Sequence, residues 1–88
     1  MNALKKNQME NFGKLFPSIS DELAEVVLLY ASGATQLEIV SLHPHLTKDK
    51  VNNMLHKAKR DLGLHSVQTL RVVVHNRLYL ALLGLLDF

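Results

Sequence analysis

The stretch TKDKVNNMLHKAKRDLGL, residues 47–64, has the pattern of an amphipathic helix. Its apolar residues recur at steps of four, three and four, which places them in one stripe on one side of a helix. The stripe consists of Val51, Leu55, Ala58 and Leu62. Thr47 is a suitable N-cap, because its hydroxyl can accept a hydrogen bond from the first turn, and Gly63 is the residue type that commonly follows the last turn. The sequence therefore predicts a helix over residues 48–62.

The other side of this helix is basic and carries amide groups. Its residues are Lys48, Lys50, Asn52, Asn53, His56, Lys57, Lys59 and Arg60, with the acids Asp49 and Asp61. Such a face suits the major groove of duplex DNA, where lysine and arginine neutralise phosphates and amides contact base edges. The alternative is an ordinary solvated helix face without a ligand.

Length and composition limit the chain to one small domain. It has 88 residues, of which 48% are hydrophobic, enough for a single compact core. There is no cysteine, which excludes disulfides and thiolate metal sites. Residues 1–12 lack the apolar run of a signal peptide, and the apolar run 78–86 is too short to span a bilayer. We therefore expect a cytoplasmic protein that does not bind membranes.

The net charge of +2 is distributed unevenly. Residues 1–46 contain three lysines and five acids, whereas residues 47–88 contain seven lysines and arginines and three acids. A polyanionic partner is therefore expected to bind the second half of the chain.

Further helices are predicted on both sides of the basic segment. Residues 1–16 have the apolar spacing of a short amphipathic helix, formed by Leu4, Met9, Phe12, Leu15 and Phe16. Ser20 and Thr35 can cap two more helices, which Gly33 and the sequence His43-Pro44-His45 end. A last helix is expected from Ser66 onward. No stretch alternates apolar and polar residues as a strand would, so the predicted fold class is all-α.

The residues around this pattern resemble a known family. The stretch ISDELAEVVLLYASGATQLEI, residues 19–39, is similar to the opening of the LuxR/GerE-type helix-turn-helix DNA-binding domain. In that family an aliphatic residue and a Ser/Thr cap precede a Glu-Val-Leu helix, followed by Ala-x-Gly-x-Ser/Thr and Glu-Ile. The later matches are Leu46-Thr47, Val51, Leu62-Gly63-Leu64 and Ser66, so that the resemblance covers residues 19–78.

The resemblance implies a four-helix core over residues 19–78, preceded by a helical segment (1–17) and followed by an apolar tail (79–88). It implies a stand-alone bacterial transcription regulator that is not an enzyme, needs no cofactor and binds double-stranded DNA as a dimer. The chain departs from the family at several positions. His43-Pro44-His45 has one residue more than the usual turn, and Lys50, Asn52, Met54 and Asp61 replace the family's Thr, Lys, His and basic residue.

The predicted DNA contacts fall into two groups. The candidates for contact with base edges are Lys50, Asn52, Asn53 and His56, and the candidates for contact with phosphates are Thr35, Gln36, Lys48, Lys57 and Arg60. Thr35 and Gln36 are included because the start of a helix offers backbone N–H groups to a phosphate. The alternative for Asn52 and Asn53 is a plain surface amide, and Lys59 is expected to face solvent.

Metal binding and catalysis find no support in the sequence. The histidines of His43-Pro44-His45 lack the cysteines or nearby carboxylates that would complete a zinc site, so a polar turn is predicted. No Gly-rich phosphate loop, nucleophile with an adjacent base, or close carboxylate pair is present.

The last helix is apolar on all sides, so more than one face must be covered. Its predicted dimer or partner interface consists of Val74, Leu78, Leu82 and Leu85. The alternative is that the N-terminal helix folds back over it, and we expect both arrangements to contribute. Two functions follow: a dimeric DNA-binding regulator, or an antagonist that binds another LuxR-type regulator through residues 72–88 and has little DNA affinity.

Overall fold

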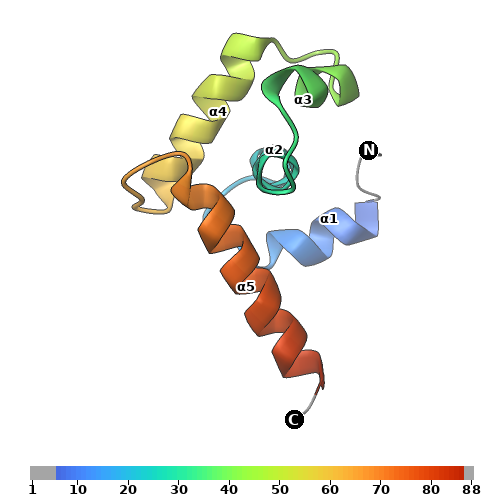
Figure 1. Cartoon of the computed structure of the whole chain (residues 1–88). Coiled ribbons are helices and arrows are strands. Elements are labelled where there is room, and N and C mark those ends of the chain that lie inside the picture. Colours follow the sequence, from blue (N-terminus) through green and yellow to red (C-terminus); the bar gives the residue numbers. More distant parts are fainter. Residues whose placement is uncertain (1–5, 87–88) are drawn as a thin grey trace.

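A computed structural model describes residues 6–86, except the side chains of Lys6, Met9, Leu85 and Leu86. The described part contains five helices and no strand, which confirms the predicted all-α class (Figure 1). The helices are α1 (Lys6–Gly13), α2 (Asp21–Ala31), α3 (Gln36–Leu42), α4 (Lys48–Asp61) and α5 (Thr69–Leu86). The predicted core contributions of Leu4 and Met9 lie outside the described residues.

Three helices begin at the residues that the sequence predicts. The hydroxyl oxygens of Ser20, Thr35 and Thr47 each accept a hydrogen bond from the backbone N–H three residues further on, at 3.1–3.2 Å. Each bond satisfies one of the N–H groups that have no partner in the first turn of a helix. These caps fix where α2, α3 and α4 start.

The predicted helix ends are also confirmed. Gly33 and Gly63 have φ angles of 103° and 69°, in the left-handed region that residues with a side chain rarely adopt. After Gly33 the N–H of Ala34 returns to the carbonyl of Leu29, and after Gly63 the N–H of Leu64 returns to the carbonyl of Lys59. Glycine therefore allows the chain to leave α2 and α4 abruptly.

Two boundaries differ from the prediction. Helix α5 begins at Thr69 rather than near Ser66, because the preceding residues form tight turns and the Ser66 hydroxyl bonds to that of Thr69 at 2.8 Å. Helix α1 ends at Gly13, before Phe16, and the N–H groups of Leu15 and Phe16 donate to the carbonyls of Phe12 and Gly13, three residues earlier. In both cases the apolar pattern runs past the hydrogen-bonded helix.

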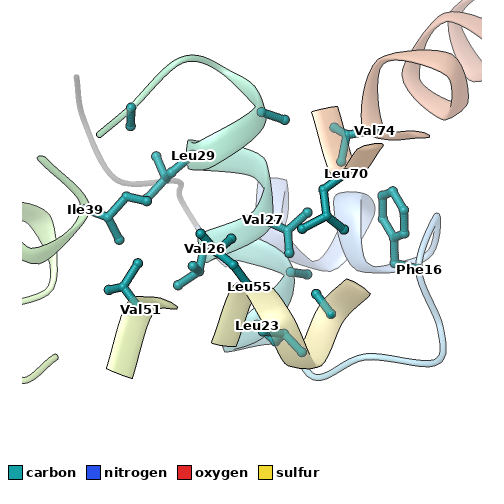
Figure 2. Close-up of a cluster of buried hydrophobic side chains, with 14 of the residues drawn as sticks. Phe16, Leu23, Val26, Val27, Leu29, Ile39, Val51, Leu55, Leu70 and Val74 are labelled. Atoms are coloured by element: carbon teal, nitrogen blue, oxygen red, sulfur yellow. The ribbon is translucent and has the colours of Figure 1, made fainter. Parts of the chain in front are cut away.

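Helix α2 lies at the centre of the core, and the other helices pack around it (Figure 1). In Figure 2, Val26 of α2 lies near Leu55 of α4, Leu29 faces Ile39 of α3, and Val27 faces α5. The fully buried large side chains are Phe16, Val26, Val27, Ile39, Val51, Leu55, Leu70 and Val74. Because α3 and α4 pack on α2 with their inner sides, their outer sides face solvent.

The segment after α1 is attached to α5. The Arg77 guanidinium donates a hydrogen bond to the carbonyl of Leu15 at 2.6 Å, and its carbon lies 4.5 Å from the centre of the buried Phe16 ring. The Phe12 ring packs against Phe16 at 5.2 Å. Leu15 and Phe16 thus contact α5 through Arg77, as predicted, whereas Phe12 packs on Phe16 and its helix α1 packs against α2 rather than α5.

No helix in the part of the chain that the structure describes combines the length and the apolar character required to cross a membrane.

Candidate nucleic-acid interface

Helix α4 separates its apolar and polar residues as predicted. Val51, Leu55 and Ala58 are buried and Leu62 packs against the core, whereas the lysines near the start of the helix are exposed. The buried stripe holds α4 against α2 and α3, which determines the face that α4 turns to solvent.

The residues on the far side of α4 form a row that we call the outer row: Asp49, Asn53, His56 and Arg60. They follow steps of four, three and four, as the buried stripe does, but start two residues earlier, about 200° around the helix. All are exposed except the half-buried His56. Asp49 is not among the predicted DNA contacts, although its four-residue spacing to Asn53 is the sequence signal that places it in this row.

Lysines lie on both sides of the outer row. At 100° per residue, Lys48 and Lys59 fall on the same edge as Asn52, and Lys50 and Lys57 fall on the opposite edge. Except for the half-buried Lys59, these side chains are exposed. A row of hydrogen-bonding groups between two edges of positive charge matches a major groove between two phosphate backbones.

Helices α3 and α4 are joined by a hydrogen bond between two predicted DNA contacts. The side-chain amide nitrogen of Gln36 donates to the amide oxygen of Asn52 at 3.3 Å. This bond places the start of α3 beside α4, and it occupies part of the amide that Asn52 would offer to a base. Adenine recognition needs both ends of an amide, so Asn53 is the better placed of the two asparagines.

An ion pair occupies one of the predicted phosphate contacts. Lys57 Nζ lies 2.7 Å from a carboxylate oxygen of Asp61, one turn further along α4. The Lys57 side chain remains 60% exposed, so solvent screening keeps the pair weak and a phosphate can compete for the lysine. Asp61 therefore lowers the positive potential on this edge of α4 without burying the lysine.

The start of α3 is occupied by its own side chains. The Thr35 N–H donates to the Glu38 carboxylate at 3.1 Å, and the Glu38 N–H donates to the Thr35 hydroxyl at 3.1 Å, which forms a capping box. The Thr35 N–H is therefore not free for a phosphate. The hydrogen bond from the Thr35 backbone N–H, and to a smaller extent one from its side chain, lowers the pKa of Glu38. The start of α3 therefore keeps a negative charge.

This capping box predicts a pH-dependent stability. The pKa of Glu38 is lower in the folded than in the unfolded protein, so ionised Glu38 adds to the free energy of unfolding. This stabilisation is complete above the unfolded-state pKa and is lost as the pH falls through the folded-state pKa. Glu38→Gln is thus expected to reduce the free energy of urea unfolding at pH 7 and to have no effect once Glu38 is protonated. Glu10→Gln, an exposed substitution on α1, is the control. A Glu38→Gln effect of equal size at pH 7 and pH 3 would contradict the assignment.

The longer turn between α3 and α4 is fastened to α2. His45 Nε2 lies 3.2 Å from a carboxylate oxygen of Glu22, and His43 Nε2 lies 3.6 Å from one of Glu25. The two imidazole rings meet edge to face, with their centres 5.8 Å apart. The additional residue of His43-Pro44-His45 is thus accommodated by contacts with one side of α2.

These histidines do not assemble a metal site. Across the described residues, no group of three or more histidine, cysteine, aspartate or glutamate side chains has an arrangement that could hold a metal ion. Of the two, His45 lies within hydrogen-bond distance of Glu22 on α2, whereas the 3.6 Å between His43 Nε2 and Glu25 is too long for a hydrogen bond.

The predicted interface on α5 requires one correction. Val74 is fully buried against the core, so it cannot contact a partner. Leu78 is half-buried and also packs against the core, whereas Leu82 is 53% exposed; the side chain of Leu85 lies outside the described residues. Only Leu82 among the described candidates is freely accessible, because α2 and Phe16 cover the side of α5 that carries Val74.

The exposed apolar residues of α5 lie mainly in its C-terminal half, which runs away from the other helices (Figure 1). Those in the C-terminal half are Tyr79, Leu80, Leu82 and Leu83, which we call the tail patch. Beside it, an open groove of about 590 Å³ separates α1 from α5. Its lining is formed by Gln8, Asn11, Phe12, Leu15, Leu28, Leu78 and Ala81. Clustered exposed apolar side chains of this kind are typical of a protein contact.

Comparisons of this chain with models of protein families, with curated proteins and with solved structures found no match.

Proposed function

We propose that this protein is a bacterial transcription regulator of the LuxR/GerE type that binds DNA as a dimer, with α4 as the recognition helix. The observation that supports this proposal best is the face of α4 opposite its buried stripe. There a row of hydrogen-bonding side chains lies between lysines on both edges. The family assignment rests on the sequence resemblance over residues 19–78.

The arrangement of α3 and α4 agrees with this use. In a helix-turn-helix protein the first helix crosses the DNA backbone and supports a second helix that enters the major groove. Here α3 is short, capped and joined to α4 through Gln36 and Asn52. The exposed N-terminal half of α4 is then free to approach base edges.

The direct test is binding to a pool of random DNA duplexes at two salt concentrations. Phosphate contacts make the affinity fall steeply with salt, and base contacts enrich particular sequences after selection. We expect both effects. A protein that enriches no sequence and binds no duplex even at low salt would contradict the proposal.

Two substitutions separate base contacts from phosphate contacts. Asn53→Ala is expected to relax the preference at one base position, at a cost of about 1–3 kcal/mol for the preferred sequence. Lys57→Ala is expected to weaken all sequences alike and to reduce the slope of log affinity against log salt by about one. Affinities of both variants for a selected and a scrambled duplex provide the measurement. Equal effects of both substitutions on both duplexes would show that α4 touches only phosphates.

A second function is favoured by the tail patch and by the Lys57–Asp61 ion pair. In this alternative the protein pairs with another LuxR-type regulator through α5 and has little DNA affinity of its own. The tail patch supplies an apolar contact surface, and Asp61 lowers the positive potential of α4. This alternative predicts tight association with a partner regulator and weak binding to every duplex.

A further inference from the structure

We propose that Asp49 determines specificity within the proposed DNA site by accepting a hydrogen bond from the N4 amino group of a cytosine. This inference rests on the proposed function, because it assigns a base to one residue of the recognition helix. Asp49 is the single acid of the outer row, and its neighbours on the surface of α4 are Lys48, Lys50 and Asn53.

The position of Asp49 on α4 carries the first part of the argument. It starts the outer row, two residues before Val51, so its side chain leaves α4 on the side opposite the core. Asp49 also lies in the first turn of α4. Recognition helices of this class direct their N-terminal residues at base edges, so the carboxylate lies where a base contact is made.

The contacts of Asp49 carry the second part. Its carboxylate is exposed, and no hydrogen bond or ion pair joins it to another group in residues 6–86. The other acid of α4, Asp61, is paired with Lys57. An unpaired carboxylate within a basic face would repel the phosphates of DNA unless it meets a hydrogen-bond donor.

The chemistry of the major groove supplies that donor. A carboxylate only accepts hydrogen bonds, and the amino groups that point into the major groove belong to cytosine and adenine. Cytosine presents its N4 amino group alone, whereas adenine presents N6 beside the acceptor N7, which suits an amide better. Asp49 therefore matches cytosine, and Asn53, one turn further along the same row, matches adenine.

The competing explanation is that Asp49 only stabilises α4 and contacts no base. A carboxylate in the first turn stabilises a helix through the macrodipole, and Asp49 is the acid of that turn in α4. Such a role changes stability, or changes affinity for all duplexes together, and leaves every base preference as it was. Base preference is therefore the property that separates the two roles.

The experiment is selection from a random duplex pool with the wild type, Asp49→Ala, Asn53→Ala and Asp61→Ala. The last variant is the matched control, since it removes the same charge from the same helix outside the outer row. For the wild type we expect a cytosine at one position, roughly fivefold to hundredfold preferred over other bases. It should lie within about two base pairs of the position that Asn53→Ala relaxes, because the four residues from Asp49 to Asn53 advance about 6 Å along the helix.

Asp49→Ala should lose the cytosine preference alone and keep the position assigned to Asn53. Asp61→Ala should bind all duplexes more tightly and change no preference. If Asp49→Ala instead behaves as Asp61→Ala does, Asp49 acts only through its charge and the inference is overturned while the proposed function stands. If the wild type enriches no sequence, the proposed function itself fails, and the cytosine assignment fails with it. Circular dichroism of each variant identifies any loss of folding.

Discussion

Leu82→Asp is expected to convert the proposed dimer into a folded monomer and to abolish its high-affinity DNA binding. Leu82 is 53% exposed in the tail patch, so the substitution leaves the core intact. In a dimer interface, however, the new carboxylate would lose its water without gaining a partner, which is strongly unfavourable. Two recognition helices must engage half-sites about 34 Å apart. Loss of the second helix is therefore expected to lower the affinity roughly 10²- to 10⁴-fold.

Analytical ultracentrifugation and DNA titration measure the two effects of Leu82→Asp. Val72→Asp is the matched control, because Val72 is 65% exposed on the same helix but lies outside the tail patch. This control should remain a dimer and bind DNA. A wild type that sediments as a monomer at high concentration would contradict the proposed dimer and favour a different regulator as the partner. In that case Leu82→Asp should abolish association with that regulator and leave DNA binding unchanged.

Phe16→Ala is expected to have the largest effect on stability. The ring is fully buried and lies beneath the Arg77 guanidinium, so its removal leaves a cavity and also takes away a cation–π contact. We expect a loss of about 3–5 kcal/mol in the free energy of unfolding. A small domain has only about 5–15 kcal/mol in total, so this variant should be close to unfolded at elevated temperature.

Urea unfolding at a fixed protein concentration measures the effect of Phe16→Ala, since association also contributes to the stability of a dimer. Leu37→Ala is the control, because Leu37 is 67% exposed on α3, and its effect should stay within about 0.5 kcal/mol. A Phe16→Ala variant that loses less than about 1 kcal/mol would show that the segment after α1 contributes little to the core.

Helices α2, α3 and α4 and their starts were predictable because their signals are local. A cap at Ser20, Thr35 or Thr47 uses a hydrogen bond across three residues, and a helix end at Gly33 or Gly63 depends on one backbone angle. The buried stripe of α4 was also predictable, since only one of its faces is apolar. The basic outer face of α4 follows from the same pattern, because residues outside the stripe must point away from the core.

The tertiary structure alone decided what α5 buries. Apolar residues surround this helix, so its sequence contains no period that separates Val74, which is fully buried, from Leu82, which is exposed. The buried side of α5 is the side that packs against α2 and that carries Arg77, which contacts Phe16. These residues are far apart in the chain and meet only in the folded protein. The same holds for the bond between Gln36 and Asn52, which no local pattern predicts because it joins two helices. Local periodicity thus determined α2, α3 and α4 and the outward face of α4, whereas contacts between distant residues determined which side of α5 remains exposed.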